Sequence, residues 1–320
     1  MWEFKAGKIC LTANWLGSGG IWYLGSMKTS DLNAMREQAN WLELCPRLTI
    51  SSAPLIEKLE EQPCSELRCD DWNLCKDMMR GDGYFAYREW FASAFVDRLA
   101  EGFRQLDSAG LHPVYIFVFD EAWEVLLRLK PLLEDLLGDY LSLPAVWSWY
   151  VTPKNQTAFS PHRDQVHEVL IDDESHMDYL TIWVPLTDVD DSNSSICLLP
   201  ASADPDFEEG VVGVRVENLQ DIRSLQGPRG SVFCWSTQIA HWGTTQSEFG
   251  QPRMSLGFYV QRASAQCIDG PPIDFSETTN LEERLAIIGQ QILDYSRTAS
   301  DDELAFAAQL VNLPVATNQQ

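Results

Sequence analysis

The chain has 320 residues, of which 45% are hydrophobic and 22% are charged, and this composition excludes a disordered, collagenous or coiled-coil protein. Its 23 basic and 47 acidic residues give a formal net charge of −24 at pH 7, so we expect neither a nucleic acid nor an anionic membrane surface as a partner. No stretch approaches ~20 consecutive apolar residues, and Glu3 and Lys5 place charges where a signal peptide needs an apolar run. We therefore expect a cytoplasmic protein.

The first half of the chain predicts helices and one strand. A helix is expected over Ser30–Leu44, and apolar residues recur at helical spacing from Tyr84 to Leu106. The run Val114–Phe119 is dense in β-branched and aromatic residues and predicts a buried strand. A further helix is expected over Glu121–Leu137, with Gly138 as its C-terminal cap.

From about residue 145 the pattern changes to short apolar runs separated by turn residues, which is typical of an antiparallel sandwich or a barrel of jelly-roll type. The expected strands are Ala145–Val151, Tyr179–Leu186, Ile196–Leu199, Val211–Val216, Ser231–Trp235 and Met254–Gln261. Two helices should follow. The first has Leu281, Leu285, Ile288 and Ile292 on one face, and the second begins at a capping-box pattern, Ser300-x-x-Glu303.

Four of the eight cysteines gather in the first quarter of the chain after Cys10, at Cys45, Cys64, Cys69 and Cys75. A structural zinc site built from these four is the alternative to free thiols. The four and five residues between the last three cysteines are looser than the C-x2-4-C spacing of zinc sites, so we expect thiols.

The pair His162 and Asp164 has a spacing that can carry metal chemistry. On an extended segment, side chains two residues apart share a face, so the imidazole and the carboxylate would point at one spot. A distant histidine, such as His241, would complete the facial triad of non-haem Fe(II) oxygenases, which leaves three coordination positions open.

Arg253 and Ser255 open a later strand and also share a face. A guanidinium and a hydroxyl so placed can hold a carboxylate through a bidentate fork and a third hydrogen bond. Together, the metal ligands and the carboxylate clamp suggest a chelating 2-oxo acid as co-substrate.

The segment Pro161-His162-Arg163-Asp164, followed by Tyr179–Asp188, resembles the phytanoyl-CoA dioxygenase-like family of Fe(II)/2-oxoglutarate oxygenases. The resemblance covers about residues 145 to 262, and further motifs continue it in order: Leu198-Leu199-Pro200, Gly230-Ser231-Val232-Phe233, His241-Trp242-Gly243 and Arg253-x-Ser255. The chain departs from the family at Ala201-Ser202-Ala203 and at Ser231, where the family often has Gly-Ser-His and Asp.

The resemblance implies a mainly β fold with flanking helices, in which a double-stranded β-helix (jelly-roll, cupin-like) core holds Fe(II) at its mouth. It implies that the iron ligands are His162, Asp164 and His241. Arg253 and Ser255 would anchor the distal carboxylate of 2-oxoglutarate, with Trp183 near this co-substrate.

The implied reaction uses O2 to hydroxylate a small organic metabolite while 2-oxoglutarate is decarboxylated to succinate and CO2. Halogenating relatives replace the carboxylate ligand, so Asp164 favours hydroxylation. We expect one oxygenase domain over 1–320. It would comprise an N-terminal extension (1–83), a helical support with a strand (84–144), the β-helix core (145–262) and C-terminal helices (263–320).

Other residues have simpler interpretations. His167 would lie on the face opposite His162 and Asp164 on an extended backbone, His176 lies in an acidic stretch, and His112 is assigned no role. Arg163 should face away from the ligands, and the C-terminal helices are expected to serve packing or oligomerisation. The tryptophans at 147, 149 and 235 are expected mainly in the core, with part of the set lining the pocket.

Two alternatives to the dioxygenase remain at this stage. A non-catalytic β-helix binding module would not need the complete ligand and clamp set. A zinc-dependent hydrolase or isomerase on a similar barrel would leave Arg253-x-Ser255 without a purpose.

Overall fold

The computed structural model describes residues 31–60, 69–153, 159–164, 178–207, 213–266, 271–277, 280–296 and 299–313. Within these ranges the strands form two antiparallel sheets, a larger one in the order β1-β6-β3-β8-β2 and a smaller one in the order β5-β4-β7. The strands are β1 Tyr84–Tyr87, β2 Tyr140–Val151, β3 Tyr179–Pro185, β4 Ile196–Leu198, β5 Arg223–Leu225, β6 Val232–Ser236, β7 His241–Gly243 and β8 Arg253–Arg262.

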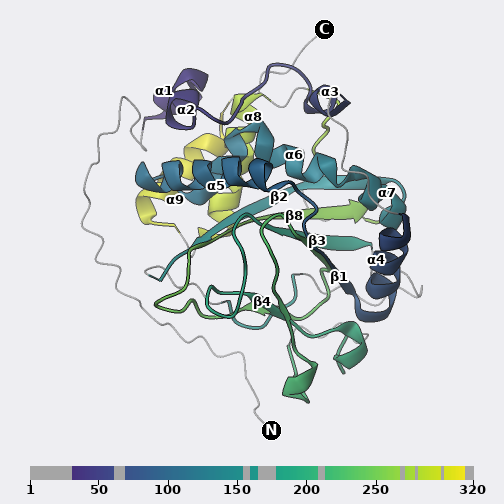
Figure 1. Ribbon diagram of the computed structural model, residues 1–320. Helices are drawn as coiled ribbons and strands as arrows, with labels where there is room; N and C mark the ends of the chain where they lie inside the picture. Colours follow the sequence, from purple (N-terminus) through teal and green to yellow (C-terminus); the bar gives the residue numbers. More distant parts are fainter. Residues whose placement is uncertain are drawn as a thin grey trace.

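Helices cover one side of the larger sheet, and β4 of the smaller sheet lies on the other side (Figure 1). The described helices are α1 Leu32–Arg36, α2 Gln38–Leu44, α3 Leu55–Glu60, α4 Cys69–Asp82, α5 Ser93–Ser108, α6 Asp120–Arg128, α7 Lys130–Leu137, α8 Leu281–Asp294 and α9 Asp301–Val311. No helix in the described part of the chain is both long and apolar enough to cross a membrane.

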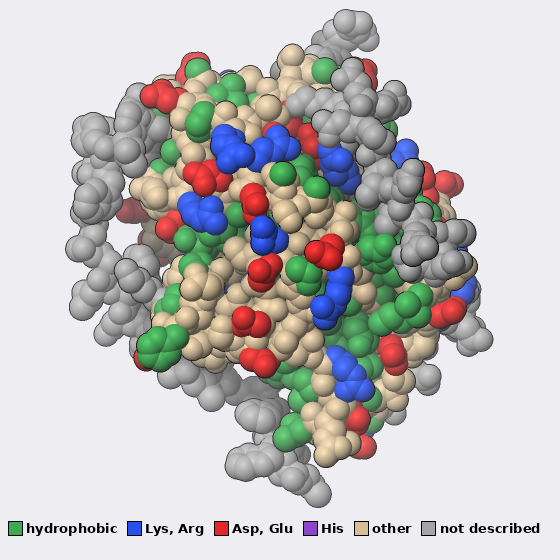
Figure 2. All heavy atoms as spheres, in the orientation of Figure 1, with side chains coloured by type: hydrophobic (Ala, Val, Ile, Leu, Met, Phe, Trp, Pro, Cys, Tyr) green, Lys and Arg blue, Asp and Glu red, His purple; other side chains and the backbone are tan. Residues whose placement is uncertain are grey.

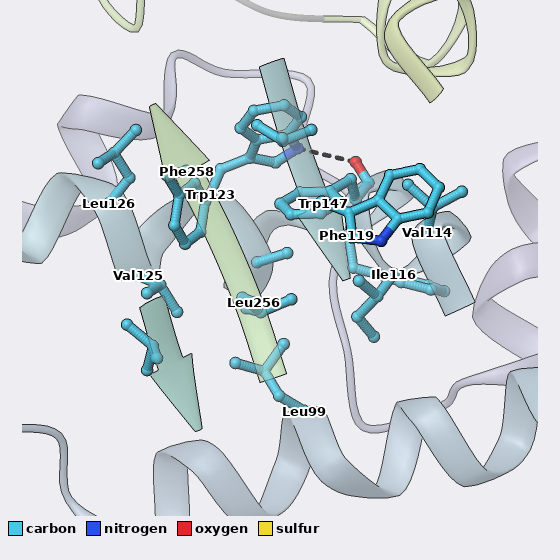
Figure 3. Packing of buried hydrophobic residues seen from close by; sticks show 14 of the residues in the cluster. Leu99, Val114, Ile116, Phe119, Trp123, Val125, Leu126, Trp147, Leu256 and Phe258 are labelled. Carbon is cyan, nitrogen blue, oxygen red and sulfur yellow. Dashed lines mark hydrogen bonds between the residues drawn. The ribbon is translucent and has the colours of Figure 1, made fainter. Parts of the chain in front are cut away.

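The central strands β3 and β6 of the larger sheet are buried on both faces because each face packs against a different layer. In β3, Leu180 and Ile182 belong to the core shared with the helices, whereas Trp183 belongs to a second cluster that joins the two sheets. In β8, Leu256 and Phe258 lie among helix residues such as Leu99 of α5 (Figure 3). The alternate residues of β3 and β8 therefore face the smaller sheet, and the candidate site lies between the sheets.

The predicted strand over Val114–Phe119 is wrong, because this segment is a 3-10 helix over Pro113–Val118. Pro113 occupies the first turn, where its missing N–H costs nothing, and the His112 imidazole caps the turn by accepting a hydrogen bond from the Val114 N–H (3.2 Å). All residues from Val114 to Val118 are buried. A short apolar run does not distinguish a buried strand from a buried helical turn.

Three further predictions need correction. The helical pattern from Tyr84 hides β1, which pairs with β6, and the helix α5 begins only at Ser93. The expected helix over Ser30–Leu44 breaks at Glu37, whose backbone is extended, and the helix over Glu121–Leu137 breaks at Leu129, two residues before Pro131.

The expected strand Val211–Val216 is also wrong where it is described, since residues 213–216 form no strand and the remainder lies outside the described residues. The C-terminal predictions are confirmed. Both α8 and α9 form, and the Ser300–Glu303 capping box is present at the start of α9.

Acidic and basic side chains alternate on the face shown in Figure 2, although the chain as a whole is strongly acidic. Exposed ion pairs occur at the surface of the described residues, such as Arg229 with Asp97 (2.9 Å). Exposed pairs of this kind contribute little to stability. This face therefore presents mixed charge rather than a field of one sign.

Candidate metal centre

Two side chains that are close in sequence and one from a distant part of the chain converge between the two sheets. The ligand atoms of His162, Asp164 and His241 all lie within 4.8 Å of one another. Asp164 Oδ1 is 3.8 Å from His162 Nε2 and 3.5 Å from His241 Nε2. Atoms bonded to one ion at about 2 Å lie roughly 3–4 Å apart, so the three groups are spaced to hold a single metal.

Backbone hydrogen bonds hold the two histidines together. The His162 N–H donates to the His241 carbonyl (3.0 Å), and the His241 N–H donates to the His162 carbonyl (2.9 Å), so the two residues form a β-bridge. This bridge sets the imidazole centroids 4.4 Å apart. The His162 side chain is 40% exposed and that of His241 only 9%, which places the first at the mouth of the site and the second deep within it.

Both imidazoles have the tautomer that a metal ligand needs. His162 Nδ1 lies 2.8 Å from the Ser160 carbonyl, and His241 Nδ1 lies 3.0 Å from the Ile239 carbonyl. Because a carbonyl oxygen only accepts hydrogen bonds, each Nδ1 must carry the proton when the ring is neutral. The lone pair is then on Nε2, the atom that faces Asp164, as in metal sites whose histidines are oriented by backbone carbonyls.

The two oxygens of Asp164 have different surroundings. Oδ1 faces both imidazoles, whereas Oδ2 accepts a 2.7 Å hydrogen bond from the Thr181 hydroxyl on β3. This arrangement presents one carboxylate oxygen to a metal, so the three residues would supply three ligand atoms and leave the remaining octahedral positions to other ligands.

Arg163 anchors the segment between the two sequence-adjacent ligands. Its guanidinium forms a buried bidentate pair with Asp204 (2.6 and 3.1 Å) and donates to the Gln238 carbonyl (2.6 Å). The sequence predicted that Arg163 faces away from the ligands, and the structure adds the partner that holds it there. Breaking a buried ion pair of this kind costs about 3–5 kcal/mol.

Arg253 and Ser255 of β8 lie deep beside this centre. The Arg253 side chain donates to the Ser194 carbonyl (2.7 Å) and lies over the ring of Trp183, with its Cζ 5.4 Å from the ring centroid. Arg253 Nε, Ser255 Oγ and Trp183 Nε1 are buried without a hydrogen-bond partner. Burial lowers the pKa of Arg253 from its ordinary value of 12.5 to about 10, and no described carboxylate pairs with it.

The three potential ligands and Arg253 line one cavity of about 100 Å³, whose walls are largely aromatic. Trp147 and Trp149 of β2 both contribute to the walls, so these two and Trp235 lie at the cavity as well as in the buried layers. Phe159 packs on Trp149 (4.8 Å between centroids) and extends the aromatic wall toward His162.

Several other predicted candidates lie away from this cavity or cannot be placed. His112 caps the 3-10 helix, and burial lowers its pKa. Cys45 and Cys75 are buried, and the only potential metal-binding group among the described residues is the histidine–aspartate set. The positions of Cys64, His167 and His176 lie outside the described residues, as does the side chain of Cys69.

Sequence reasoning missed three hydroxyl groups at the site, those of Thr181, Tyr259 and Tyr295. Thr181 and Tyr259 are directly opposite each other on β3 and β8, and Tyr295 is the C-cap residue that follows α8. The alternation of β8 from Arg253 and Ser255 would have placed Tyr259 on the same face. Nothing in the local sequence indicates that the end of a C-terminal helix reaches the cavity.

Comparison with solved structures finds the same fold in ThoJ, a non-heme monooxygenase. ThoJ is 14% identical, with a TM-score of 0.50 over 74% of this chain and 98% of that one. The non-heme alpha-ketoglutarate-dependent epimerase SnoN from nogalamycin biosynthesis is 16% identical, with a TM-score of 0.45 over 65% and 96%. Iron-bound HygX from Streptomyces hygroscopicus is 15% identical, with a TM-score of 0.45 over 62% and 88%. No protein-family model matches the chain, and no curated protein matches it.

Proposed function

We propose that this protein is an Fe(II)/2-oxoglutarate-dependent dioxygenase, related to the phytanoyl-CoA dioxygenase-like family, that hydroxylates a small organic metabolite. The observation that carries the proposal is that a His-Asp-His trio and the buried Arg253, which no described carboxylate pairs with, line one cavity. Ser255, whose buried hydroxyl has no hydrogen-bond partner, lies two residues from Arg253 on the same strand. The two antiparallel sheets around this cavity support a double-stranded β-helix core.

The donor set fits iron(II). Two imidazole nitrogens and one carboxylate oxygen match the ligand types of non-haem iron oxygenases and leave open positions for a chelating co-substrate and O2. Bound iron(II) would supply the oxidising chemistry, in which 2-oxoglutarate and O2 become succinate and CO2 while a substrate C–H group becomes an alcohol. The protein's part is to hold, orient and shield these reactants.

The buried polar groups beside the trio fit the distal carboxylate of 2-oxoglutarate. Arg253 would supply charge-assisted hydrogen bonds and Ser255 a further donor, satisfying atoms that otherwise have no partner. Trp183 packs on the guanidinium and would fix its plane. The 2-oxo acid end would then point toward His162, Asp164 and His241, because these three residues line the same cavity as Arg253.

The lining of the cavity also bears on the substrate. Arg253 is the only Lys or Arg among the described residues that line the cavity, and aromatic side chains dominate the rest of them. With Arg253 engaged by the co-substrate, the described aromatic walls would favour a substrate that is largely apolar. ThoJ, which has the same fold, is described as a non-heme monooxygenase, and this description is consistent with oxygenation chemistry on the fold.

The alternatives explain less. A zinc-dependent hydrolase could use the same three ligands, but it would leave a buried cation without an anion. Burying a charge without a partner is unfavourable by several kcal/mol. In a non-catalytic module, no function would explain why Arg253 is buried in this way.

The test is anaerobic addition of Fe(II) and then 2-oxoglutarate to metal-free protein. We expect a visible metal-to-ligand charge-transfer band in the wild type and none in His162→Ala or Asp164→Ala. Asp190→Ala is the matched control, because Asp190 is an exposed carboxylate outside the cavity. Oxygen-dependent succinate formation should follow the band. A folded, iron-loaded wild type without the band, or turnover that survives Asp164→Ala, would contradict the proposal.

A further inference from the structure

The strand β8 alternates between two environments, and one position on its cavity side carries no side chain. The even-numbered residues from Met254 to Val260 belong to the core shared with the helices. The odd-numbered residues face the other way, and Arg253, Gly257 and Tyr259 line the cavity. Gly257 therefore leaves a gap in the row of side chains that borders the candidate site.

Neither the backbone conformation nor the packing of the protein requires glycine at position 257. Gly257 is not among the described glycines with positive φ. A Cβ built there would have the carbonyl oxygens of Trp147 and Ile182 and the Cβ of Trp147 as its nearest atoms, at 3.7, 4.0 and 4.0 Å, which is ordinary contact. At Gly102, by contrast, a Cβ would meet Leu48 at 2.6 Å. Alanine at position 257 would thus fit the protein without displacing an atom.

The presence of this glycine is explained better by a ligand than by the strand itself. Glycine weakens a strand interior, and it often marks a place where a ligand approaches the backbone closely. An aromatic side chain on a neighbouring strand can cover such a glycine, and Gly257 pairs with Trp147 on β2 and Trp183 on β3. No ring atom is among the three atoms nearest to the built Cβ. The space above Gly257 is therefore open to the cavity.

Gly257 lies between the two sets of groups that would hold the co-substrate. Arg253 lies toward one end of β8. Toward the other end, Tyr259 is directly opposite Thr181, whose hydroxyl donates a hydrogen bond to the candidate metal ligand Asp164. Successive residues on one face of a strand are about 7 Å apart. A molecule that extends from Arg253 to the metal centre therefore passes over Gly257.

We propose that Gly257 is a specificity-determining residue, whose missing side chain makes room for the unbranched carbon chain of 2-oxoglutarate between Arg253 and the metal. This inference rests on the proposed function and names the residue that shapes its co-substrate subsite. Because the chain would lie against the glycine backbone, even one added methyl group would occupy its place. A compound that chelates the metal but has no such chain would not depend on position 257.

The experiment is calorimetric titration of Ni(II)-loaded wild type and Gly257→Ala with 2-oxoglutarate and, separately, with oxalate. Ni(II) is a redox-inactive probe, and oxalate can chelate the same metal but has no carbon chain that reaches Arg253. Gly81→Ala is the matched control, because Gly81 lies on α4 outside the cavity and a Cβ there would meet nothing within 4 Å. Circular dichroism and Tm of each metal-free protein verify folding.

We expect Gly257→Ala to weaken 2-oxoglutarate binding by about tenfold or more, the effect of one extra methyl group in a close-fitting site. Its affinity for oxalate should stay close to that of the wild type. Because alanine restricts the unfolded chain more than glycine does, both Gly257→Ala and Gly81→Ala should keep or slightly raise Tm. Only Gly257→Ala should lose affinity for 2-oxoglutarate. A merely structural glycine would show the opposite pattern, a lower Tm with unchanged affinity.

Three results would overturn the inference. The first is an affinity of Gly257→Ala for 2-oxoglutarate equal to that of the wild type. The second is a clear fall in the Tm of this variant, which would show that packing requires the glycine. The third is an equal loss of affinity for 2-oxoglutarate and oxalate, because the methyl group would then act at the metal. A wild type that takes up no Ni(II), or that binds oxalate but not 2-oxoglutarate, would instead refute the proposed function, so the two failures are distinguishable.

Discussion

Replacing Arg253 by methionine separates a binding role from a structural one. Arg253 is only 5% exposed, and the described contacts of its guanidinium are one carbonyl and one aromatic ring. Burial lowers its pKa from 12.5 to about 10, and at 1.36 kcal/mol per pKa unit this corresponds to roughly 3 kcal/mol of unfavourable burial. Because the folded-state pKa is the lower one, this cost is present in full below about pH 10.

Arg253→Met removes this cost but leaves the Ser194 carbonyl without its donor, a loss of about 1–3 kcal/mol. The two terms nearly cancel, so we expect the free energy of unfolding of the protein without 2-oxoglutarate to change by less than about 2 kcal/mol. If Arg253 instead belonged to a buried ion pair, its removal would cost about 3–5 kcal/mol.

The assay is urea denaturation of the metal-loaded protein under anaerobic conditions, with and without 2-oxoglutarate. A ligand at 100 times its Kd should stabilise the wild type by about 2.7 kcal/mol, and we expect no such stabilisation in Arg253→Met. The matched control is Arg262→Met, at the far end of the same strand, where the arginine pairs with Asp178 (2.6 Å). This variant should lose stability and keep the response to 2-oxoglutarate.

The lowered pKa of Arg253 also predicts how the affinity for 2-oxoglutarate depends on pH. The wild-type affinity for 2-oxoglutarate should stay level from about pH 7 to 9 and fall as the pH rises past about 10, where Arg253 loses its charge. An Arg253→Met protein that loses 3–5 kcal/mol of stability yet still binds 2-oxoglutarate would refute the reasoning.

Three further predictions concern neighbouring features. Ser255→Ala should change stability by less than about 1 kcal/mol, since its buried hydroxyl has no partner, but should weaken 2-oxoglutarate binding several-fold in calorimetry; unchanged affinity would remove it from the clamp. Asp204→Ala should cost about 3–5 kcal/mol in urea denaturation by removing the carboxylate that pairs with the buried Arg163, and a loss under 1 kcal/mol would show that this pair is not structurally important. Gly230→Ala should lower Tm more than Gly110→Ala: both have positive φ (81° and 70°), but only at Gly230 would a Cβ meet a backbone oxygen, at 2.6 Å; equal losses would contradict this.

The sequence was sufficient to predict two pairs of side chains that share a face, because a spacing of two residues on an extended backbone places both side chains on the same side. His162 and Asp164 share a face at an offset of two residues, and so do Arg253 and Ser255. Their convergence with His241 required the resemblance to a known family, because no local pattern tells which distant histidine completes a trio. The assignment of these residues as iron and 2-oxoglutarate ligands stays a prediction.

Elements whose form depends on tertiary contacts were less predictable. The strands β1, β5 and β7 have only three or four residues, too few for a periodic signal. Val114–Phe119 is apolar because it is enclosed on all sides, and this composition is shared by buried strands and buried helical turns. Tyr295 could not be predicted for a related reason: its position at the cavity depends on how α8 packs against the sheet.

The reciprocal backbone hydrogen bonds between His162 and His241 mean that the fold, not an ion, brings the two imidazoles together. An ion entering such a preorganised pocket meets donors already aligned, and its capture requires little ordering of the chain. Loading and removal by a chelator should accordingly be reversible, with the sheets intact throughout. This sets the protein apart from small zinc domains, which unfold when their metal is withdrawn.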